Sequence, residues 1–150
     1  MRVIPVIRYC QPEDYDKVLP LIKDTVLKAL PGQQFEEDKI EILFEKALID
    51  EDYTGIVLFI DNEICGYILG YITEHYFHSK KIAYCMSIYV KEDKRAYGLE
   101  MLRSFEAWGK YRGADTLSIS YFKGLSPESL KKVLTKMKYE EQEVAYWKEV

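Results

Sequence analysis

The sequence predicts an α/β fold in which helices flank a mixed central sheet. Six short segments rich in β-branched and aromatic residues are typical of strands. Four longer segments repeat apolar residues at helical spacing. The expected order is strand, helix, helix, three strands, helix, strand, helix, strand. No repeat, low-complexity tract or linker interrupts this order, so we expect one domain over residues 1–150.

Composition supports a folded domain and disfavours several functional classes. The chain has 150 residues, 48% of them hydrophobic, which is enough for one real core. Its 21 basic and 25 acidic residues form no strong basic block, so a nucleic-acid partner is not favoured. The longest uncharged apolar run, residues 64–73, is too short to span a membrane, and the start MRVIPVIR lacks the apolar stretch of a signal peptide.

The three cysteines are far apart and form no CxxC pair. This usage favours buried thiols in a reducing cytoplasm over disulfides or zinc. We therefore expect a cytoplasmic protein.

The amino-terminal part is expected to form a strand and a long helix. Residues 3–9 are β-rich, and Pro12 then opens a helix with two acidic residues behind it. Pro20 lies within the helical pattern and should kink the helix or delay its start. Pro31 and Gly32 should end it. The apolar repeat consists of Tyr15, Val18, Leu19, Ile22, Val26 and Leu30.

A second helix and three strands should follow. Residues 54–60 indicate a buried strand, Asp61 and Asn62 a hairpin turn, and residues 64–73 and 82–90 two further strands. The helix before them has one apolar face made of Ile40, Leu43, Phe44, Ala47 and Leu48.

The last third is expected to form helix, strand, helix and strand. Gly113 is placed to cap the first of these helices, and residues 116–122 alternate like a strand. Ser126 and Pro127 are a suitable N-cap and first-turn pair. Residues 142–149 alternate as a closing strand. The apolar faces of the two helices are Met101, Leu102, Phe105 and Trp108, and Leu130, Val133, Leu134 and Met137.

The junction between strand 82–90 and the next helix is the most informative stretch. A helix start presents unpaired backbone N–H groups and the positive end of the helix dipole, so residues 95–99 could hold a pyrophosphate. Gly98 permits close approach to the backbone, and Lys94 and Arg95 add positive charge. On the local pattern alone, a solvated turn is the more common outcome.

Four stretches of the chain resemble the GNAT acetyltransferase superfamily. They are RYCQPEDYDKVLPLI, IDNEICGYILGYI with Gly66, SIYVKEDKRAYGLEMLRSFEAWGKYRGADTLSIS, and KKVLTKMKYEEQEVAYWKEV. The resemblance covers nearly all 150 residues. It implies a GNAT-like acyl-CoA N-acyltransferase fold in which the fourth and fifth strands splay apart.

The resemblance also implies acetyl-CoA as co-substrate and direct attack by an amine. The pantetheine arm would lie between the splayed strands and bond the backbone of the fourth strand. Loop and helix-start amides would hold the pyrophosphate. The positions implied are Ile88, Tyr89 and Val90 for the arm, and Arg95, Ala96, Tyr97, Gly98 and Leu99 for the pyrophosphate.

The chain departs from the family pattern at several positions. The family loop R-G-x-G-x-G/A carries Ala96 and Glu100 here, and Leu134 falls where many members have a tyrosine acid. A carboxylate at position 100 would repel a pyrophosphate unless it points away or pairs with Arg103. Residues 82–90 contain no acid, although many members carry a glutamate base there.

Amine acetylation needs one proton removed from the ammonium and one given to the departing sulfur. Tyr121 is the positional candidate for the acid. Ser87, where the family glutamate often stands, and Tyr84 could orient a water as base. For all three, ordinary packing in the sheet is the commoner role.

Two other groups of reactive side chains are weaker candidates. His75 and His78 stand three residues apart beside Glu74, but no third ligand accompanies them, so no metal is expected. Cys85 has no His or Asp partner that would make it a nucleophile.

We therefore predict an N-acetyltransferase acting on a primary amine, either a small molecule or a protein. The resemblance implies an acceptor side at residues 31–35 and 139–142, and the short second connection suits a macromolecular acceptor or a partner chain. The alternative, favoured by Ala96, Glu100 and Leu134, is an inactive GNAT-like binding or regulatory module. Such a module would pair as a homodimer through its sheet or closing strand.

Overall fold

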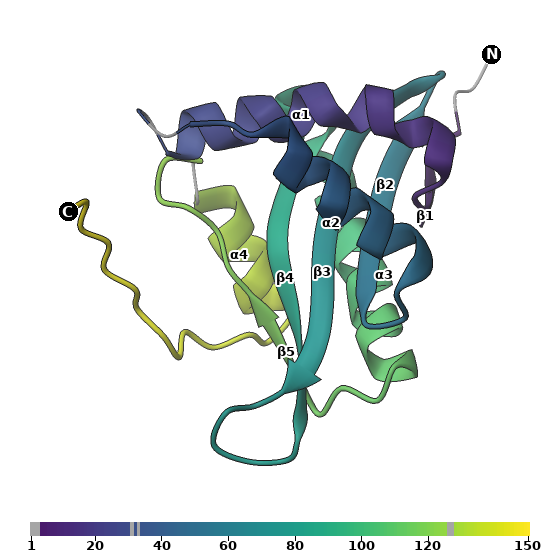
Figure 1. The fold of residues 1–150 in the computed structure, drawn as a ribbon. Coiled ribbons are helices and arrows are strands. Elements are labelled where there is room, and N and C mark those ends of the chain that lie inside the picture. Colours follow the sequence, from purple (N-terminus) through teal and green to yellow (C-terminus); the bar gives the residue numbers. More distant parts are fainter. Residues whose placement is uncertain (1–3, 31, 33, 126–127) are drawn as a thin grey trace.

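The computed structural model describes residues 4–30, 32, 34–125 and 128–150. No helix within these ranges is long and apolar enough to cross a bilayer. The helices and strands, in chain order, are β1 (Val6–Tyr9), η1 (Pro12–Asp14), α1 (Tyr15–Ala29), α2 (Glu37–Ile49), β2 (Tyr53–Ile60), β3 (Glu63–Glu74), β4 (Lys81–Val90), η2 (Glu92–Tyr97), α3 (Gly98–Tyr111), β5 (Thr116–Ile119) and α4 (Glu128–Lys136) (Figure 1).

The five strands form one mixed sheet in the order β1-β2-β3-β4-β5. Neighbours from β1 to β4 are antiparallel, whereas β4 and β5 are parallel. Helices α1 and α2 cover one face and α3 and α4 the other (Figure 1). The expected α/β fold with a mixed central sheet is confirmed.

The β2–β3 hairpin turns where the sequence predicts it. Asp61 and Asn62 both have positive φ, 52° and 64°. A two-residue turn with two positive φ angles matches the right-handed twist of antiparallel strands. Short polar side chains tolerate this conformation better than β-branched ones do.

Helix α1 passes through Pro20 without a delayed start. It begins at Tyr15, preceded by the 3-10 helix η1, and continues to Ala29. Pro20 deprives only the carbonyl of Asp16 of its usual N–H donor. Asp16 is exposed in the first turn, where water can satisfy that carbonyl.

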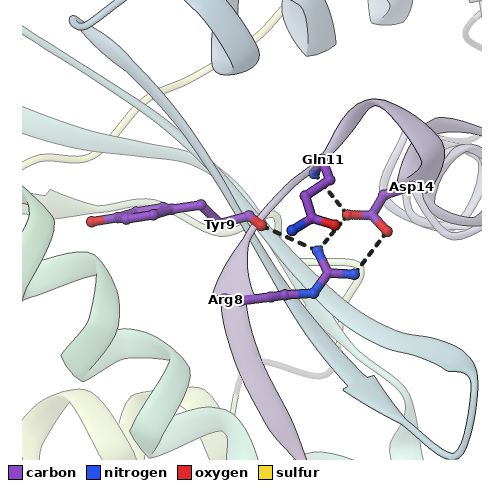
Figure 2. Close-up of polar contacts among 4 residues, drawn as sticks. All are labelled: Arg8, Tyr9, Gln11 and Asp14. Atoms are coloured by element: carbon purple, nitrogen blue, oxygen red, sulfur yellow. Dashed lines mark hydrogen bonds and ion pairs between the residues drawn. The ribbon is translucent and has the colours of Figure 1, made fainter.

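Asp14 is a buried carboxylate that fixes the junction of β1 with α1. It is 2% exposed, and Arg8 donates two hydrogen bonds to it at 2.7 and 3.0 Å. The backbone N–H of Gln11 donates a third at 2.8 Å (Figure 2). These bonds hold the pKa of Asp14 below its ordinary value, the Arg8 hydrogen bond being the largest cause.

Two predicted strands differ from the structure. β5 ends at Ile119, three residues before the expected end at 122, because its pairing with β4 stops there. The expected closing strand at 142–149 is absent: residues 140–150 are exposed and form no regular structure. Alternation alone does not make a strand, since the backbone also needs an edge to pair with.

Other expectations fall partly or wholly outside the described residues. They concern Val3, Pro31 and the Ser126–Pro127 cap. The three cysteines are free and buried, as their spacing predicts.

Candidate functional site

A cleft opens where β4 and β5 separate. The two strands pair from Ile82 with Thr116 to Cys85 with Ile119. β4 then continues to Val90, still paired with β3, while the chain after Ile119 leaves the sheet. The β5-facing edge of β4 is therefore bare over its last residues, which is the splay that the family resemblance implies.

Residues of β4, η2, the start of α3, α4 and the chain after β5 line this cleft, which we call the β4–β5 cleft. Its lining residues are Ile88, Tyr89, Val90, Arg95, Gly98, Leu102, Tyr121, Leu125, Ser129, Leu130 and Val133.

Five of the eight predicted cofactor positions line the cleft directly: Ile88, Tyr89, Val90, Arg95 and Gly98. The other three do not. Ala96 is exposed, Tyr97 packs against the core on the α3 side, and Leu99 is half-buried.

Gly98 is the first residue of α3 and faces open space. A Cβ at this position would meet no atom within 4 Å, and φ is −61°, which any residue adopts. Neither packing nor backbone conformation therefore requires glycine here. Because glycine has no side chain, the cleft has room here for a ligand to lie directly against the backbone.

The helix start is less open than the sequence predicts. The chain enters α3 through the 3-10 helix η2, and the Gly98 N–H donates to the Arg95 carbonyl. That amide is engaged within the chain. An Ala at position 96 suits such a helical turn, whereas the family glycine would permit other backbone conformations.

Two cations and one carboxylate stand at the mouth of the cleft. Arg95 donates its Nε–H to the Val90 carbonyl at 3.4 Å. Lys28 of α1 lies with its Nζ 5.8 Å from the centre of the Tyr89 ring. Both line a recess next to the cleft together with Glu92. Glu100, suspected from the sequence, is exposed and lines neither cavity.

Sequence reasoning missed Lys28 and Glu92. Lys28 comes from a helix 60 or more residues away from the loop, and no local pattern marks it. Glu92 is visible in the KEDKR run, but only the turn of η2 brings it to the mouth. Gly124, which lines the same recess, packs closely against the backbone of α1, because a Cβ there would lie 2.9 Å from the Lys28 carbonyl oxygen.

Ser87 lies just past the part of β4 that pairs with β5, and its hydroxyl contacts a buried tyrosine. The hydroxyls of Tyr67 and Ser87 are 2.9 Å apart, within hydrogen-bond distance. Burial raises the pKa of Tyr67 despite this bond, so its hydroxyl keeps its proton near neutral pH. Ser87 is not among the residues that line the cleft.

Tyr121 lies two residues past the end of β5 and lines the cleft. Ser129 of α4 lines it as well, a hydroxyl that the sequence analysis did not single out. Leu134, at the position of the family tyrosine, packs against the core on the α3 side instead.

Cys85 is unsuited to be a nucleophile. It is 1% exposed, burial raises the pKa of its thiol to about 12, and the thiol donates to the Ser87 carbonyl at 3.7 Å. Such a thiol stays protonated.

His75 and His78 stack at 4.4 Å on the β3–β4 connection. Each accepts a backbone N–H at its Nδ1. Within the described part of the chain, no three His, Cys, Asp or Glu side chains gather in a way that could hold a metal ion. Tyr84 stacks on Tyr71 at 5.2 Å.

Comparisons with known proteins agree with the fold. The family model described as "Acetyltransferase (GNAT) family" matches residues 19–123. No curated protein sequence matches the chain significantly.

Solved structures of low sequence identity share the fold. An aminoglycoside N-acetyltransferase, AAC(6')-Iy in complex with CoA, has 15% identity and a TM-score of 0.76 over 99% of this chain and 97% of that one. A ribosomal-protein-alanine N-acetyltransferase from Brucella melitensis biovar Abortus 2308 has 16% identity and a TM-score of 0.75 over 98% of each chain. The aminoglycoside acetyltransferase meta-AAC0020 from an uncultured soil metagenomic sample, in complex with sisomicin, has 19% identity and a TM-score of 0.72 over 97% and 96%. Because the family model covers more than half of the sequence, this chain belongs to the acetyltransferase (GNAT) family.

Proposed function

We propose that this protein transfers the acetyl group of acetyl-CoA to a primary amine by direct attack in a ternary complex. The observation that carries the proposal is the β4–β5 cleft, with a bare strand edge along it and an unfilled glycine at one end. A solved neighbour of the same fold is a complex with CoA.

The residues around the cleft suit the parts of acetyl-CoA. The edge of β4 from Ile88 to Val90, which β5 leaves unpaired, offers backbone groups to the amides of the pantetheine arm, and Arg95 already occupies the Val90 carbonyl. The open space at Gly98 accepts phosphate oxygens close to the backbone. The cations of Arg95 and Lys28 oppose the negative charge of the phosphates.

The reaction needs one proton acceptor and one proton donor, and we assign these roles to a water held by Ser87 and to Tyr121. The attacking nitrogen forms a bond to the acetyl carbon, and the carbon–sulfur bond breaks. Tyr121 gives its proton to the departing sulfur, because it lines the cleft just past the end of β5, where the two strands part. The ammonium loses its proton to a water. Ser87 does not line the cleft, and it orients this water from the position on β4 next to Ile88, where the Tyr67 hydroxyl lies 2.9 Å from its own.

The acceptor is a primary amine on a small molecule or on a protein. Neighbours of the same fold include enzymes named for aminoglycosides and for a ribosomal-protein alanine. On this chain, Pro31 and Gln33 of the predicted acceptor loop lie outside the described residues. Residues 140–142 are exposed, so the other side of the acceptor site is open, which favours an acceptor larger than a metabolite.

One observation favours a second candidate, a GNAT-like module that has lost catalysis. The Gly98 amide is engaged with Arg95, and Glu92 stands at the mouth of the cleft where phosphates would lie. Both features weaken an anion site. A module of this kind would bind acetyl-CoA weakly or not at all.

The transfer reaction is tested by thiol release from acetyl-CoA in the presence of a panel of primary amines. The panel includes an aminoglycoside and a peptide with an N-terminal alanine. We expect amine-dependent release that falls at least about 100-fold in kcat in Tyr121→Phe, the typical size of an acid's contribution. Tyr111→Phe is the matched control, since Tyr111 is 82% exposed on α3 and lines no part of the cleft. Full activity of Tyr121→Phe would remove Tyr121 from the mechanism.

A further inference from the structure

Three tyrosines stand in a row across the sheet, one on each of three neighbouring strands. Tyr71 of β3 is the register partner of Tyr53 on β2 and of Tyr84 on β4. Their rings stack, with centroids 5.9 Å apart for Tyr53 and Tyr71 and 5.2 Å apart for Tyr71 and Tyr84. We call these three residues the tyrosine row.

The tyrosine row lies on the α1/α2 face of the sheet but belongs to neither apolar core. Successive side chains of a strand point to opposite faces, and Tyr67 and Leu69, on the same face as Tyr71, pack in the core under α1 and α2. The three rings of the row are half-buried and are part of neither core. Figure 1 shows α1 and α2 crossing this face away from the β3–β4 connection, within three residues of which Tyr71 and Tyr84 lie. The part of the chain that the structure describes therefore leaves this aromatic surface partly open.

One end of the row already holds a cation of the chain itself. The Nζ of Lys46, on α2, lies 5.0 Å from the centre of the Tyr53 ring. This contact is attractive because the face of an aromatic ring carries partial negative charge. The Tyr53 end of the row is thus occupied.

The Tyr84 end combines an aromatic face, a nearby carboxylate and a small neighbour. Burial raises the pKa of Tyr84, and Tyr71 and the carboxylate of Glu143 add to the rise, so negative charge lies near this ring. Its partner on β5 is Ser118, whose short side chain leaves room beside it. Among the described residues, no cation of the chain lies over the Tyr84 ring. This end therefore suits an ammonium group that comes from outside the chain.

The Tyr84 end also adjoins the place where β4 and β5 part. The last pair of the two strands is Cys85 with Ile119, one residue after Tyr84. Ser87, to which we assign the water that takes the proton of the amine, follows three residues after Tyr84 and contacts Tyr67 on the same face. Three residues of strand span at most about 10 Å. An acceptor whose amine reacts beside Ser87 can therefore reach Tyr84 with a second group.

We propose that the Tyr84 end of the tyrosine row binds a second ammonium group of the acceptor, so that the protein selects diamines and polyamines over monoamines. The second ammonium lies over the Tyr84 ring, and Glu143 balances its charge. The reacting amine lies within about 10 Å of it, where the strands part. The role in catalysis rests on the proposed acetyl transfer, whereas the cation site can be measured without it.

The cation site is tested by NMR titration in the absence of acetyl-CoA. The probes are a linear five-carbon diamine and pentylamine, which differ by one ammonium group. We expect the diamine to bind at least about fivefold more tightly, which corresponds to one cation–π contact of about 1 kcal/mol. Tyr84→Leu should lose this preference, whereas Tyr84→Phe, which keeps the ring, should retain it. Tyr111→Leu is the control, since Tyr111 is 82% exposed on α3.

A second pair of variants changes no ring and leaves the sheet intact. Glu143 and Glu141 are both exposed in the same stretch of chain. Glu143→Gln should lower the preference for the diamine at least about twofold, a small effect because the charge is solvated. Glu141→Gln should leave the preference unchanged.

Kinetics with acetyl-CoA connect the cation site to the transfer reaction. Tyr84→Leu should raise KM for the diamine at least about fivefold and leave kcat unchanged, because the ring binds substrate and transition state alike. KM for pentylamine should not change. An aminoglycoside and a peptide with lysine after an N-terminal alanine show which source of paired ammonium groups is preferred. Acetylation of neither amine would contradict the proposed transfer, and the titration would still report on the cation site.

Three results of the titration would overturn the proposal. One is equal affinity of the wild-type protein for the diamine and for pentylamine. Another is a preference for the diamine that survives in Tyr84→Leu. The third is an equal loss of preference in Glu141→Gln and Glu143→Gln, which would assign the effect to general surface charge.

Discussion

The pair formed by Arg8 and Asp14 is the clearest case of a single side chain that fixes local structure. Asp14 is buried and accepts three hydrogen bonds, two from Arg8 and one from the Gln11 N–H. We expect Asp14→Asn to lower the free energy of unfolding by about 2 kcal/mol, since hydrogen bonds to a charged group are worth about 1.5–3 kcal/mol. Urea denaturation at pH 7 measures this, with exposed Glu13→Gln as the control. An unchanged midpoint in Asp14→Asn would contradict the assigned role.

We expect the same pair to make the free energy of unfolding depend on pH. The pKa of Asp14 is lower in the folded protein than the ordinary value of about 3.9 in an unfolded chain. Its stabilisation is therefore complete above that ordinary value and is lost as pH falls below it through the folded pKa. Stability of the Asp14→Asn variant should fall less steeply than wild type over this acidic range. Parallel curves for the two proteins would show that another carboxylate dominates.

We expect the negative charge of Glu92 to weaken acetyl-CoA binding. It lines the recess at the mouth of the cleft with Arg95 and Lys28, whereas Glu100 lines neither cavity. Glu92→Gln should tighten acetyl-CoA binding by up to about fivefold, equal to about 1 kcal/mol for a solvated charge. Glu100→Gln should leave the affinity unchanged. Calorimetric titration compares the two, and tighter binding in the Glu100 variant alone would reverse the assignment.

How much of the site could be predicted depended on whether its residues are close in sequence. Gly98 and Arg95 follow a strand directly and open a helix, a pattern visible in one sequence. Lys28 comes from α1, and its place beside Tyr89 exists only after folding. Tyr121 was predicted at the end of a strand, and it reaches the cleft because β5 stops two residues before it.

At the scale of elements, close packing of β3 on α3 depends on Gly70. A Cβ at this position would lie 2.7 Å from the Phe105 ring and 2.9 Å from the Tyr84 carbonyl oxygen. Gly70→Ala should destabilise the protein by about 1–3 kcal/mol, the usual cost of overpacking. Gly98→Ala is the matched control, because its Cβ meets nothing within 4 Å. Equal denaturation midpoints for both variants would show that β3 and α3 move apart at little cost, which would contradict the dependence on Gly70.

Elements with their own periodicity were predicted well, and those that need a distant partner were not. The helix faces and the Asp61–Asn62 turn depend on local pattern. The end of β5 and the fate of residues 142–149 depend on which edges are free, which alternation does not report. The passage of α1 through Pro20 costs one hydrogen bond, at the carbonyl of the exposed residue Asp16.

At the scale of the whole molecule, the parallel pairing of β4 with β5 creates the site. The two strands share a register over four residues and then part, so one sheet carries a packed core at one end and a cleft at the other. Helix α3 begins beside the cleft that this parting opens, with Gly98 as its first residue. The position of the proposed cofactor site thus follows from the strand topology, and the side chains around it modify its affinity.

Thermal unfolding with and without acetyl-CoA tests this account most directly. Wild type should gain about 2.7 kcal/mol of stability at a hundred times the dissociation constant, seen as a rise in Tm. Ala96→Leu, a substitution at an exposed position outside the cleft, should keep the rise, whereas Gly98→Leu should fill the open space, fold normally and lose it. No rise in wild type at millimolar acetyl-CoA, or an undiminished rise in Gly98→Leu, would contradict the account.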